Sequence, residues 1–460
     1  MHESAFKAYD AAILSAFAVL MALGLTFSTP TISFQVICGC IVLLIAFFSV
    51  QASLYLLIFA MLLSPELAVG KMDGRGVGGR ELTIRFDDIL LIIIGLSWLV
   101  KTIVYKELAL IRETPMNRPI LYYMLACVVA TGIGILSGRI RWVTGTFFIL
   151  KYFEYYFIFF MVVNHVRTRS QVVQLVGALF VTAFLISLYA IYQIPSGARA
   201  TAPFEGESGE PNTLGGYLVF MGAIAVGLIL YVESMAVRVV LIGMVGLMSL
   251  ALMATLSRSS YLAAVVLGLS VFAAKWRNPR VVVVLLIVGM LVPVFAPANV
   301  TQRVSETFFG RQYGGEIKVG GVALDLSTTD RLRSWAYIVR DWTVHPVFGY
   351  GVTGYAWADA QFVKIIGETG LVGLVTFLFI LVRLWLMARE SFLSERDPFC
   401  KGLAQGFLLG MLAMLAHSVG ANTFILIRIM EPFWLCAGLV ILLPRLTSEQ
   451  TDGTLQRARA

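Results

Sequence analysis

The uncharged run QVVQLVGALFVTAFLISLYAIYQI, residues 171–194, decides the fold class of this protein. It follows the basic stretch HVRTRS and ends where Pro195 opens a polar segment, so both of its limits are clear. Roughly 20 predominantly apolar residues in an α-helix span the hydrocarbon core of a bilayer, which is about 30 Å thick. A run of this length without a charge therefore predicts a transmembrane helix.

The same pattern recurs along the whole sequence. Of its 460 residues, 59% are hydrophobic and 13% are charged, whereas an ordinary globular domain carries about 25% charged residues. The charges gather in short breaks between the apolar runs, so we expect an all-α polytopic membrane protein with about 14 transmembrane helices. The predicted spans are 11–28, 31–49, 51–64, 87–105, 119–136, 146–163, 171–194, 213–232, 236–256, 259–274, 280–297, 365–387, 402–421 and 424–444.

The basic breaks predict the orientation. With a cytoplasmic N-terminus, the breaks KTIVYKELALIRETPMNR, HVRTRS, KWRNPR and ARESFLSERDPFCK all lie inside, as the positive-inside rule requires. The predicted organisation is a membrane domain of spans 1–11 (residues 1–297), a large outer loop containing amphipathic helices (298–364), a membrane domain of spans 12–14 (365–444) and a cytoplasmic tail (445–460).

Arginines also occur in the breaks predicted to lie outside. Arg258 sits in a Ser-Arg-Ser-Ser break between two apolar runs, where a charge is costly and marks a candidate functional site. The outer segment PSGARATAPFEGESGEPN (195–212) adds Arg199, Glu205 and Asn212; it could also be a solvated loop in which Asn212 caps the next helix. Because guanidinium groups pair with phosphate in a bidentate fork, these arginines predict an anionic ligand at the outer face.

The large outer loop contains the stretch DRLRSWAYIVRDWTVHPVFGYG, residues 330–351. It reads as an amphipathic helix with Arg333, Tyr337 and Arg340 on one face, ended by His345 before a proline. Taken alone, this stretch predicts an interfacial helix. Its tryptophans would lie at headgroup depth, and its arginine side chains would extend so that their charged ends stay in the polar layer.

Several charges are spaced as neutralising pairs. Lys364 with Glu368, Lys151 with Glu154 and Arg428 with Glu431 are three or four residues apart in apolar surroundings, which predicts structural ion pairs. The four histidines and five cysteines show no metal-ligand spacing, so we expect no metal site.

The order of these motifs resembles the O-antigen ligase and Wzy-type polysaccharide polymerase superfamily. The matching features run from about residue 200 to 374: an outer R…PF…PN segment, the SRSS break, R…W……HPVFGYG in the late loop, and IIGETGLVG at the start of a span. The resemblance implies a metal-independent glycosyltransferase of the bacterial inner membrane. Its donor would be an undecaprenyl-diphosphate-linked glycan on the periplasmic face, so the outer loop would be periplasmic.

The resemblance also implies roles for particular residues. Arg258, Arg331 and Arg333 would stabilise the departing diphosphate together with Arg199. Ligases of the family have a histidine in a His-Asn pattern before the ETG segment, where this sequence has Asp359. Asp359 is therefore the candidate base, and its identity favours polymerisation of repeat units over ligation. The residues expected to bind substrate are Arg199, Glu205, Asn212, Arg340 and His345.

Two alternatives stay open at this point. A ligase would use the same chemistry with lipid A core as acceptor, whereas a lipid-linked glycan or solute transporter would need no such chemistry. The expected partners are the lipid-linked oligosaccharide, a glycan acceptor, the bilayer and a chain-length regulator. Neither a cofactor nor a nucleic acid is expected.

Overall fold

The computed structural model describes most of the residues that follow position 48. The described residues are 44–45, 49–64, 66–71, 81–105, 113–205, 209–295, 299–302, 305, 318–319, 322–323, 326–355 and 359–459. The first predicted span and most of the second lie outside these residues.

The predicted fold class is confirmed. Eight helices among the described residues are long and apolar enough to cross a membrane. The long helices follow the predicted spans closely; for example, the run 171–194 forms α7, Arg169–Tyr192. Their bounds are α3 Val50–Leu63, α4 Phe86–Tyr105, α5 Asn117–Leu136, α6 Trp142–His165, α7 Arg169–Tyr192, α8 Pro211–Ile229, α9 Met235–Ala254, α10 Arg258–Lys275, α11 Pro279–Phe295, α13 Leu326–Trp342, α14 Gln361–Ser394, α15 Pro398–His417 and α16 Ile427–Arg459.

Two short hairpins and two helical turns complete the described elements. Strands β1 (Glu66–Lys71) and β2 (Glu81–Arg85) pair antiparallel, as do β3 (Lys318–Val319) and β4 (Val322–Ala323) in the late loop. The 3-10 turns are η1 (Ile194–Ser196) and η2 (Thr423–Ile425). The segment predicted as a tail after residue 444 continues α16 to Arg459.

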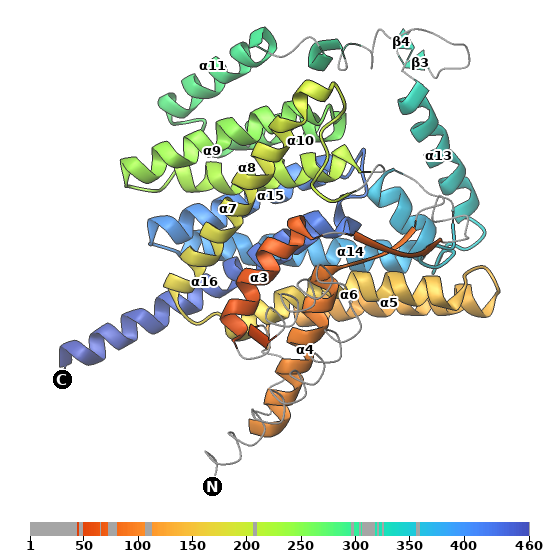
Figure 1. Ribbon diagram of the computed structural model, residues 1–460, viewed down its shortest axis with the longest axis horizontal. Helices are drawn as coiled ribbons and strands as arrows, with labels where there is room; N and C mark the ends of the chain where they lie inside the picture. The colour runs from red at the N-terminus through yellow and green to blue at the C-terminus, as the bar shows by residue number, and fades with distance from the viewer. Residues whose placement is uncertain are drawn as a thin grey trace, which may run out of the picture.

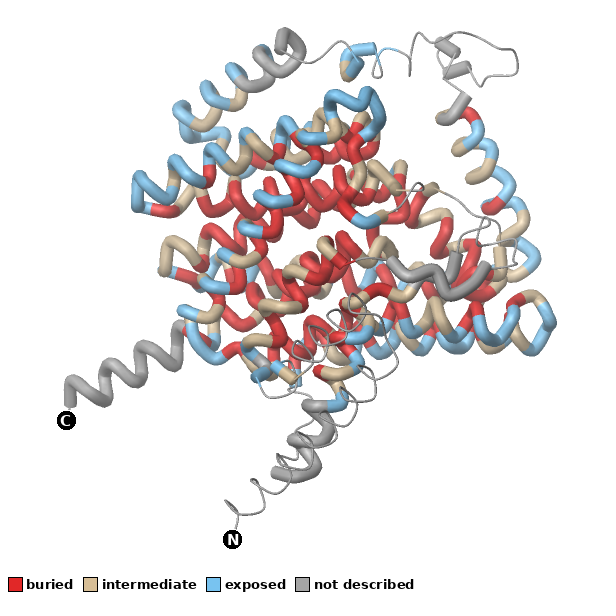
Figure 2. Tube along the Cα trace, in the orientation of Figure 1, coloured by how far each residue is buried: buried red, intermediate tan, exposed pale blue. Residues whose placement is uncertain are grey.

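The bundle is built around α8, α15 and α16, and Figure 1 shows the long helices lying side by side. Most of the apolar stretch of α8 is buried, at 83%, against 17% for α9 at the edge of the bundle. Figure 2 shows the same contrast between the buried centre and the exposed outer helices. Exposed apolar side chains on the outer helices suit a lipid surround, where lipid tails are as apolar as leucine.

Small residues bring the two central helices together. A Cβ at Gly227 of α8 would lie 2.3 Å from the backbone of Gly406 of α15, and one at Gly402 would lie 3.0 Å from Cα of Leu228. Glycines four residues apart present one flat face of α15, along which the α8 backbone can pack closely. This close contact fixes the ends of α8 and α15 relative to each other.

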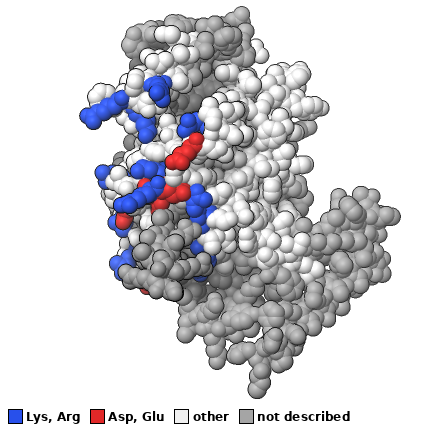
Figure 3. All heavy atoms as spheres, turned by 90° about the vertical axis from the view of Figure 1, so that its left-hand side faces the viewer, with Lys and Arg blue, Asp and Glu red and all other residues white. Residues whose placement is uncertain are grey.

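One end of the bundle is rich in basic side chains. The ends of α7, α9, α10 and α15 on one side carry Arg169, Arg238, Lys275 and Lys401. Figure 3 shows Lys and Arg gathered on the face that corresponds to the left side of Figure 1. This is the side on which the predicted cytoplasmic loops fall, and the opposite ends carry the candidate site.

The HPVFGYG segment, residues 345–351, is hydrogen-bonded to α14 at a kink in that helix. Gly370 has φ +63 inside α14, where the helix kinks. The N–H groups of Leu371 and Val372 donate to the carbonyls of Pro346 and Val347, at 2.9 and 3.1 Å. In return, the carbonyls of residues 367 and 368 accept the N–H groups of residues 350 and 351, at 3.0 and 2.7 Å. Cross-segment bonds thus replace the intrahelical bonds that the kink removes.

Candidate functional site

Arg199 and Arg258 both lie at the junction between α9 and α10, on the side predicted to be outer. Arg199 donates from Nε to the carbonyl of Thr255, at 3.1 Å, and from Nη2 to the carbonyl of Leu256, at 3.3 Å. Ser257 caps α10 through its hydroxyl, and Arg258 is the first residue of that helix. The Arg199 guanidinium is thereby held beside the N-terminus of α10, the helix that Arg258 opens, and the helix dipole there already favours an anion.

A buried chain of hydrogen bonds lies beneath this junction. The Ser257 hydroxyl donates to Oδ1 of Asn212, at 2.7 Å, and lies 2.7 Å from the Ser260 hydroxyl. The Ser260 hydroxyl lies 3.2 Å from Nε2 of His417, and Nδ1 of His417 lies 2.8 Å from the hydroxyl of Thr423. Because Ser257, Ser260, His417 and Thr423 are completely buried, these bonds fix the N-terminal turn of α10 against the end of α15.

Two of these residues differ from the sequence interpretation. Asn212, predicted to bind substrate or alternatively to cap the next helix, does not cap it: α8 begins at Pro211 with Glu210 as its N-cap, so Asn212 lies inside the helix. His417 is not among the predicted site residues. The sequence does contain a signal for His417. It is the polar residue at the end of an apolar run, and a polar break with the pattern Ser-x-Gly-x-Asn (418–422) follows it directly.

Arg331 reaches the same junction from α13. The position that a Cβ would take at Gly420 lies 3.9 Å from Nη1 of Arg331 and 2.8 Å from Oγ of Ser259. Ser259, in turn, donates to the carbonyl of Gly420, at 3.1 Å. The structure therefore brings Arg199, Arg258 and Arg331 to one place, at the ends of α9, α10 and α15.

Arg333 lies on another side of α13. Residues two apart on an α-helix point about 200° apart, so Arg331 and Arg333 face in different directions. Arg333 lies 3.8 Å from Asp330, and both side chains are substantially exposed. The structure thus separates the two arginines that the sequence groups together.

Arg340 and His345 lie further along the same loop. Arg340 is about 14 Å beyond Arg331 along the helix axis, and it pairs with Asp341 at 2.9 Å on the exposed face. The ring of His345 meets the edge of Tyr350, with centroids 4.8 Å apart. Partial burial and the nearby charge of Arg139 lower the pKa of His345 below its usual value.

Asp359 and Glu205, both predicted site residues, lie in separate loops. Asp359 lies two residues before Gln361, whose N–H donates to the carbonyl of Ser418 at 3.1 Å, so the backbone passes the end of α15 there. Glu205 is built into its own loop: it accepts the N–H groups of Ala202 and Glu210, at 3.3 and 3.1 Å, and pairs with Arg428 at 3.5 Å.

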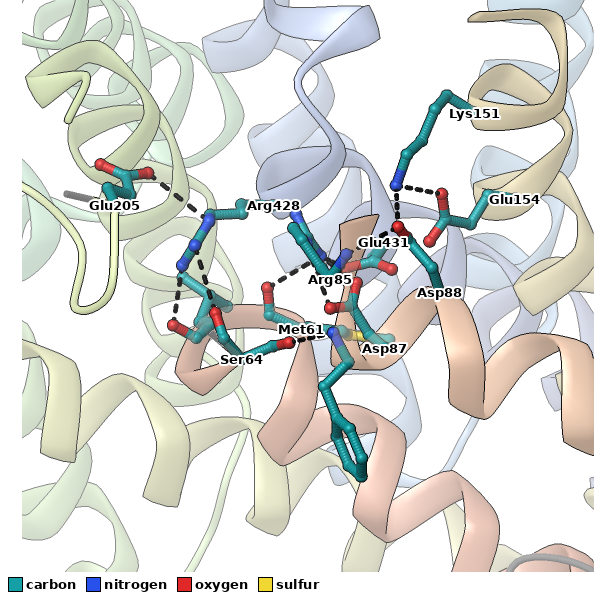
Figure 4. A network of polar contacts seen from close by, with 12 residues as sticks. Met61, Ser64, Arg85, Asp87, Asp88, Lys151, Glu154, Glu205, Arg428 and Glu431 are labelled. Atoms are coloured by element: carbon teal, nitrogen blue, oxygen red, sulfur yellow. Dashed lines mark hydrogen bonds and ion pairs between the residues drawn. The ribbon is translucent and has the colours of Figure 1, made fainter. Parts of the chain in front are cut away.

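A second network of polar contacts includes none of these three arginines (Figure 4). The predicted Lys151–Glu154 pair is present at 3.4 Å, but Arg428 and Glu431 pair elsewhere, with Glu205 and with Arg85. Carboxylate oxygens of Asp87, Glu154 and Glu431 lie within 4.8 Å of one another, so these three residues could hold a metal ion. The predicted Lys364–Glu368 pair is also present, buried, at 2.6 Å.

The comparisons with known proteins agree with the motifs. No curated protein matches the sequence. The profile of the O-antigen ligase family matches residues 243–378, a segment that includes Arg258, Arg331 and Asp359. The match supports a membrane enzyme of the O-antigen ligase or polymerase type, and over this segment it confirms the resemblance to the O-antigen ligase superfamily that the sequence predicts.

Proposed function

We propose that this protein is a polysaccharide polymerase that transfers a glycan from an undecaprenyl-diphosphate carrier on the periplasmic face of the bacterial inner membrane. The single observation that supports this most strongly is the convergence of Arg199, Arg258 and Arg331 at the outer ends of α9, α10 and α15. A diphosphate carries its charge at headgroup depth, which is where this end of the bundle would lie.

In the proposed reaction, a hydroxyl oxygen of the acceptor glycan attacks C1 of the donor sugar. The bond between C1 and the phosphate oxygen breaks, and the lipid diphosphate leaves with the electron pair. Guanidinium groups oriented before the reaction lower the barrier because the charge they stabilise grows in the transition state. Asp359 accepts the proton of the attacking hydroxyl in this proposal.

Polymerisation is favoured over ligation by Asp359, because the family's ligases carry a histidine where this protein has an aspartate. In a polymerase the acceptor is a second lipid-linked repeat unit, and a chain-length regulator would be its natural partner. In a ligase the acceptor is lipid A core, and the roles of the arginines are unchanged.

The test uses the purified protein in lipid nanodiscs with lipid-linked repeat units as the only substrate. Longer lipid-linked chains are the expected product. Product that forms only after lipid A core is added would replace the polymerase by a ligase. Movement of intact lipid-linked glycan across liposomes without bond formation would replace both by a transporter.

A matched pair of variants links the activity to the site. Arg258→Ala removes the arginine at the outer end of α10, whereas Arg277→Ala removes an exposed arginine beyond the other end of the same helix. Arg258→Ala should abolish glycan growth while Arg277→Ala keeps it. Equal activity in the two variants would refute the assignment of the site.

A further inference from the structure

Within the network in Figure 4, four carboxylates from three helices form one cluster with Arg85 and Lys151: those of Asp87, Asp88, Glu154 and Glu431. Asp87 and Asp88 lie in the first turn of α4, Glu154 lies midway along α6, and Glu431 lies in the first turns of α16. Asp87 and Glu431 are completely buried, and the side chains of Asp88 and Glu154 are only 12% and 8% exposed. Carboxylates at such sites must be compensated.

The cations of the cluster compensate only part of this charge. Arg85 contacts Asp87 and lies 2.9 Å from Glu431, and Lys151 contacts Asp88 and lies 3.4 Å from Glu154. Four carboxylates and two cations leave an excess of two negative charges when all the groups are ionised.

The neighbouring Arg428 adds nothing to this sum. It pairs with Glu205 at 3.5 Å and donates to the carbonyls of Leu62, Pro203 and Ser64. Its charge is therefore already balanced by a carboxylate outside the cluster.

The buried oxygens of the cluster independently indicate a ligand. Among the described residues, Oδ1 of Asp88, Oε1 of Glu154 and Oε1 of Glu431 are buried and receive no hydrogen bond from an amide, ammonium or guanidinium donor; the only groups opposite them are other carboxyls of the cluster, Asp88 facing Glu154 and Glu431 facing Asp87. Oxygens of Asp87, Glu154 and Glu431 nevertheless approach one another within 4.8 Å. Metal–oxygen bonds of about 2.0–2.6 Å place ligands on opposite sides of one ion roughly 4–5 Å apart, so this spacing fits a single ion.

We propose that these carboxylates bind one hard divalent cation, such as Mg²⁺, Ca²⁺ or Mn²⁺. Two positive charges cancel the excess of the cluster, and a set of carboxylate oxygens without histidine or cysteine suits this class of metal. The ion would join α4, α6 and α16 and would act apart from the arginines at the end of α10. Two protons could cancel the same charge, and the experiment separates them from a metal.

The experiment measures metal binding by the full-length protein in detergent, after chelator treatment and removal of the chelator. Mg²⁺, Ca²⁺ and Mn²⁺ are titrated separately, with calorimetry for the dissociation constant and the melting temperature as a second readout. The wild type should bind one ion per protein molecule and melt at a higher temperature in its presence. Glu431→Gln should weaken binding at least tenfold and remove the thermal shift.

Asp88→Asn, at a less buried position, is the second variant in case Glu431→Gln does not fold; it should weaken binding in the same direction. Glu205→Gln is the matched control, because it changes a buried acid of the adjacent ion pair and should leave the metal affinity unchanged. Absence of saturable binding to the wild type would overturn the proposal in favour of protons. Equal affinities of the wild type and the folded Glu431→Gln or Asp88→Asn variant would also overturn it.

Discussion

Glu368→Ala should be among the most destabilising single substitutions outside the central helices. Glu368 accepts from Lys364 at 2.6 Å, and the two side chains are only 6% and 4% exposed. The same carboxylate accepts the N–H of Thr353 at 2.9 Å, which ties the end of the HPVFGYG segment to α14. The substitution therefore leaves one buried ammonium and one buried N–H without this acceptor.

Breaking a buried ion pair from one side costs about 3–5 kcal/mol, because the remaining charge loses its counter-ion. The stranded N–H costs about 1–3 kcal/mol, part of which overlaps with the first effect. We expect a loss of about 4 kcal/mol in the free energy of unfolding, close to a thousandfold change in the equilibrium constant. Lys364→Met combined with Glu368→Leu should recover most of the loss, since apolar replacement of a buried pair is often neutral.

The assay is unfolding in mixed micelles by titration with SDS, followed by tryptophan fluorescence. Arg340→Ala is the control: its ion pair with Asp341 is exposed, with the side chains 70% and 34% accessible. Solvent screens this pair, so the substitution should leave the unfolding midpoint nearly unchanged. The reasoning is refuted if Glu368→Ala loses no more than Arg340→Ala, or if the double variant is as unstable as the single one.

Four further predictions concern α13, the kink of α14 and His345. Arg331→Ala should stop product formation, whereas Arg333→Ala should retain most of it, because the two arginine side chains point to different sides of α13. A radiolabelled assay of glycan growth measures both variants, and equal losses of activity would contradict the prediction. Gly370→Ala should destabilise the protein by about 2 kcal/mol or more, because its φ is +63 and a Cβ there would lie 2.4 Å from a main-chain oxygen. SDS titration measures the loss, and an unchanged unfolding midpoint would contradict the strained conformation at the kink. Arg139→Gln should raise the pKa of His345 towards its ordinary value, as NMR titration would detect. In the wild type, lowering the pH should destabilise this region, because the neutral imidazole is favoured in the folded state.

The spans could be predicted because they depend on length and composition alone. Residues 87–105 and 280–297, for example, are predicted within two residues of α4 and α11. The positions of Arg199 and Arg258 on one face followed from counting spans, since successive crossings alternate between sides. The position of Arg331 beside Gly420, at the start of α10, could be expected only with the family resemblance as well.

The partners of buried polar groups could not be predicted from local spacing. His417 bonds to Ser260, which is 157 residues away in the sequence. The spacing in the sequence predicts an ion pair of Arg428 with Glu431, yet Arg428 pairs with Glu205 from a distant part of the chain. Such contacts depend on how the helices pack, and apolar helices of similar composition permit many packings.

The junction between the HPVFGYG segment and α14 has a consequence for protein engineering. It is held by main-chain groups, so most of its side chains take no part in the bonds, and Val347 is 53% exposed. A mutational library could therefore vary residues 344 and 347 to change the external surface without disturbing this connection. Residues 349, 351 and 370 must stay fixed as glycine, because each has a positive φ and a Cβ there would meet main-chain atoms within 3 Å.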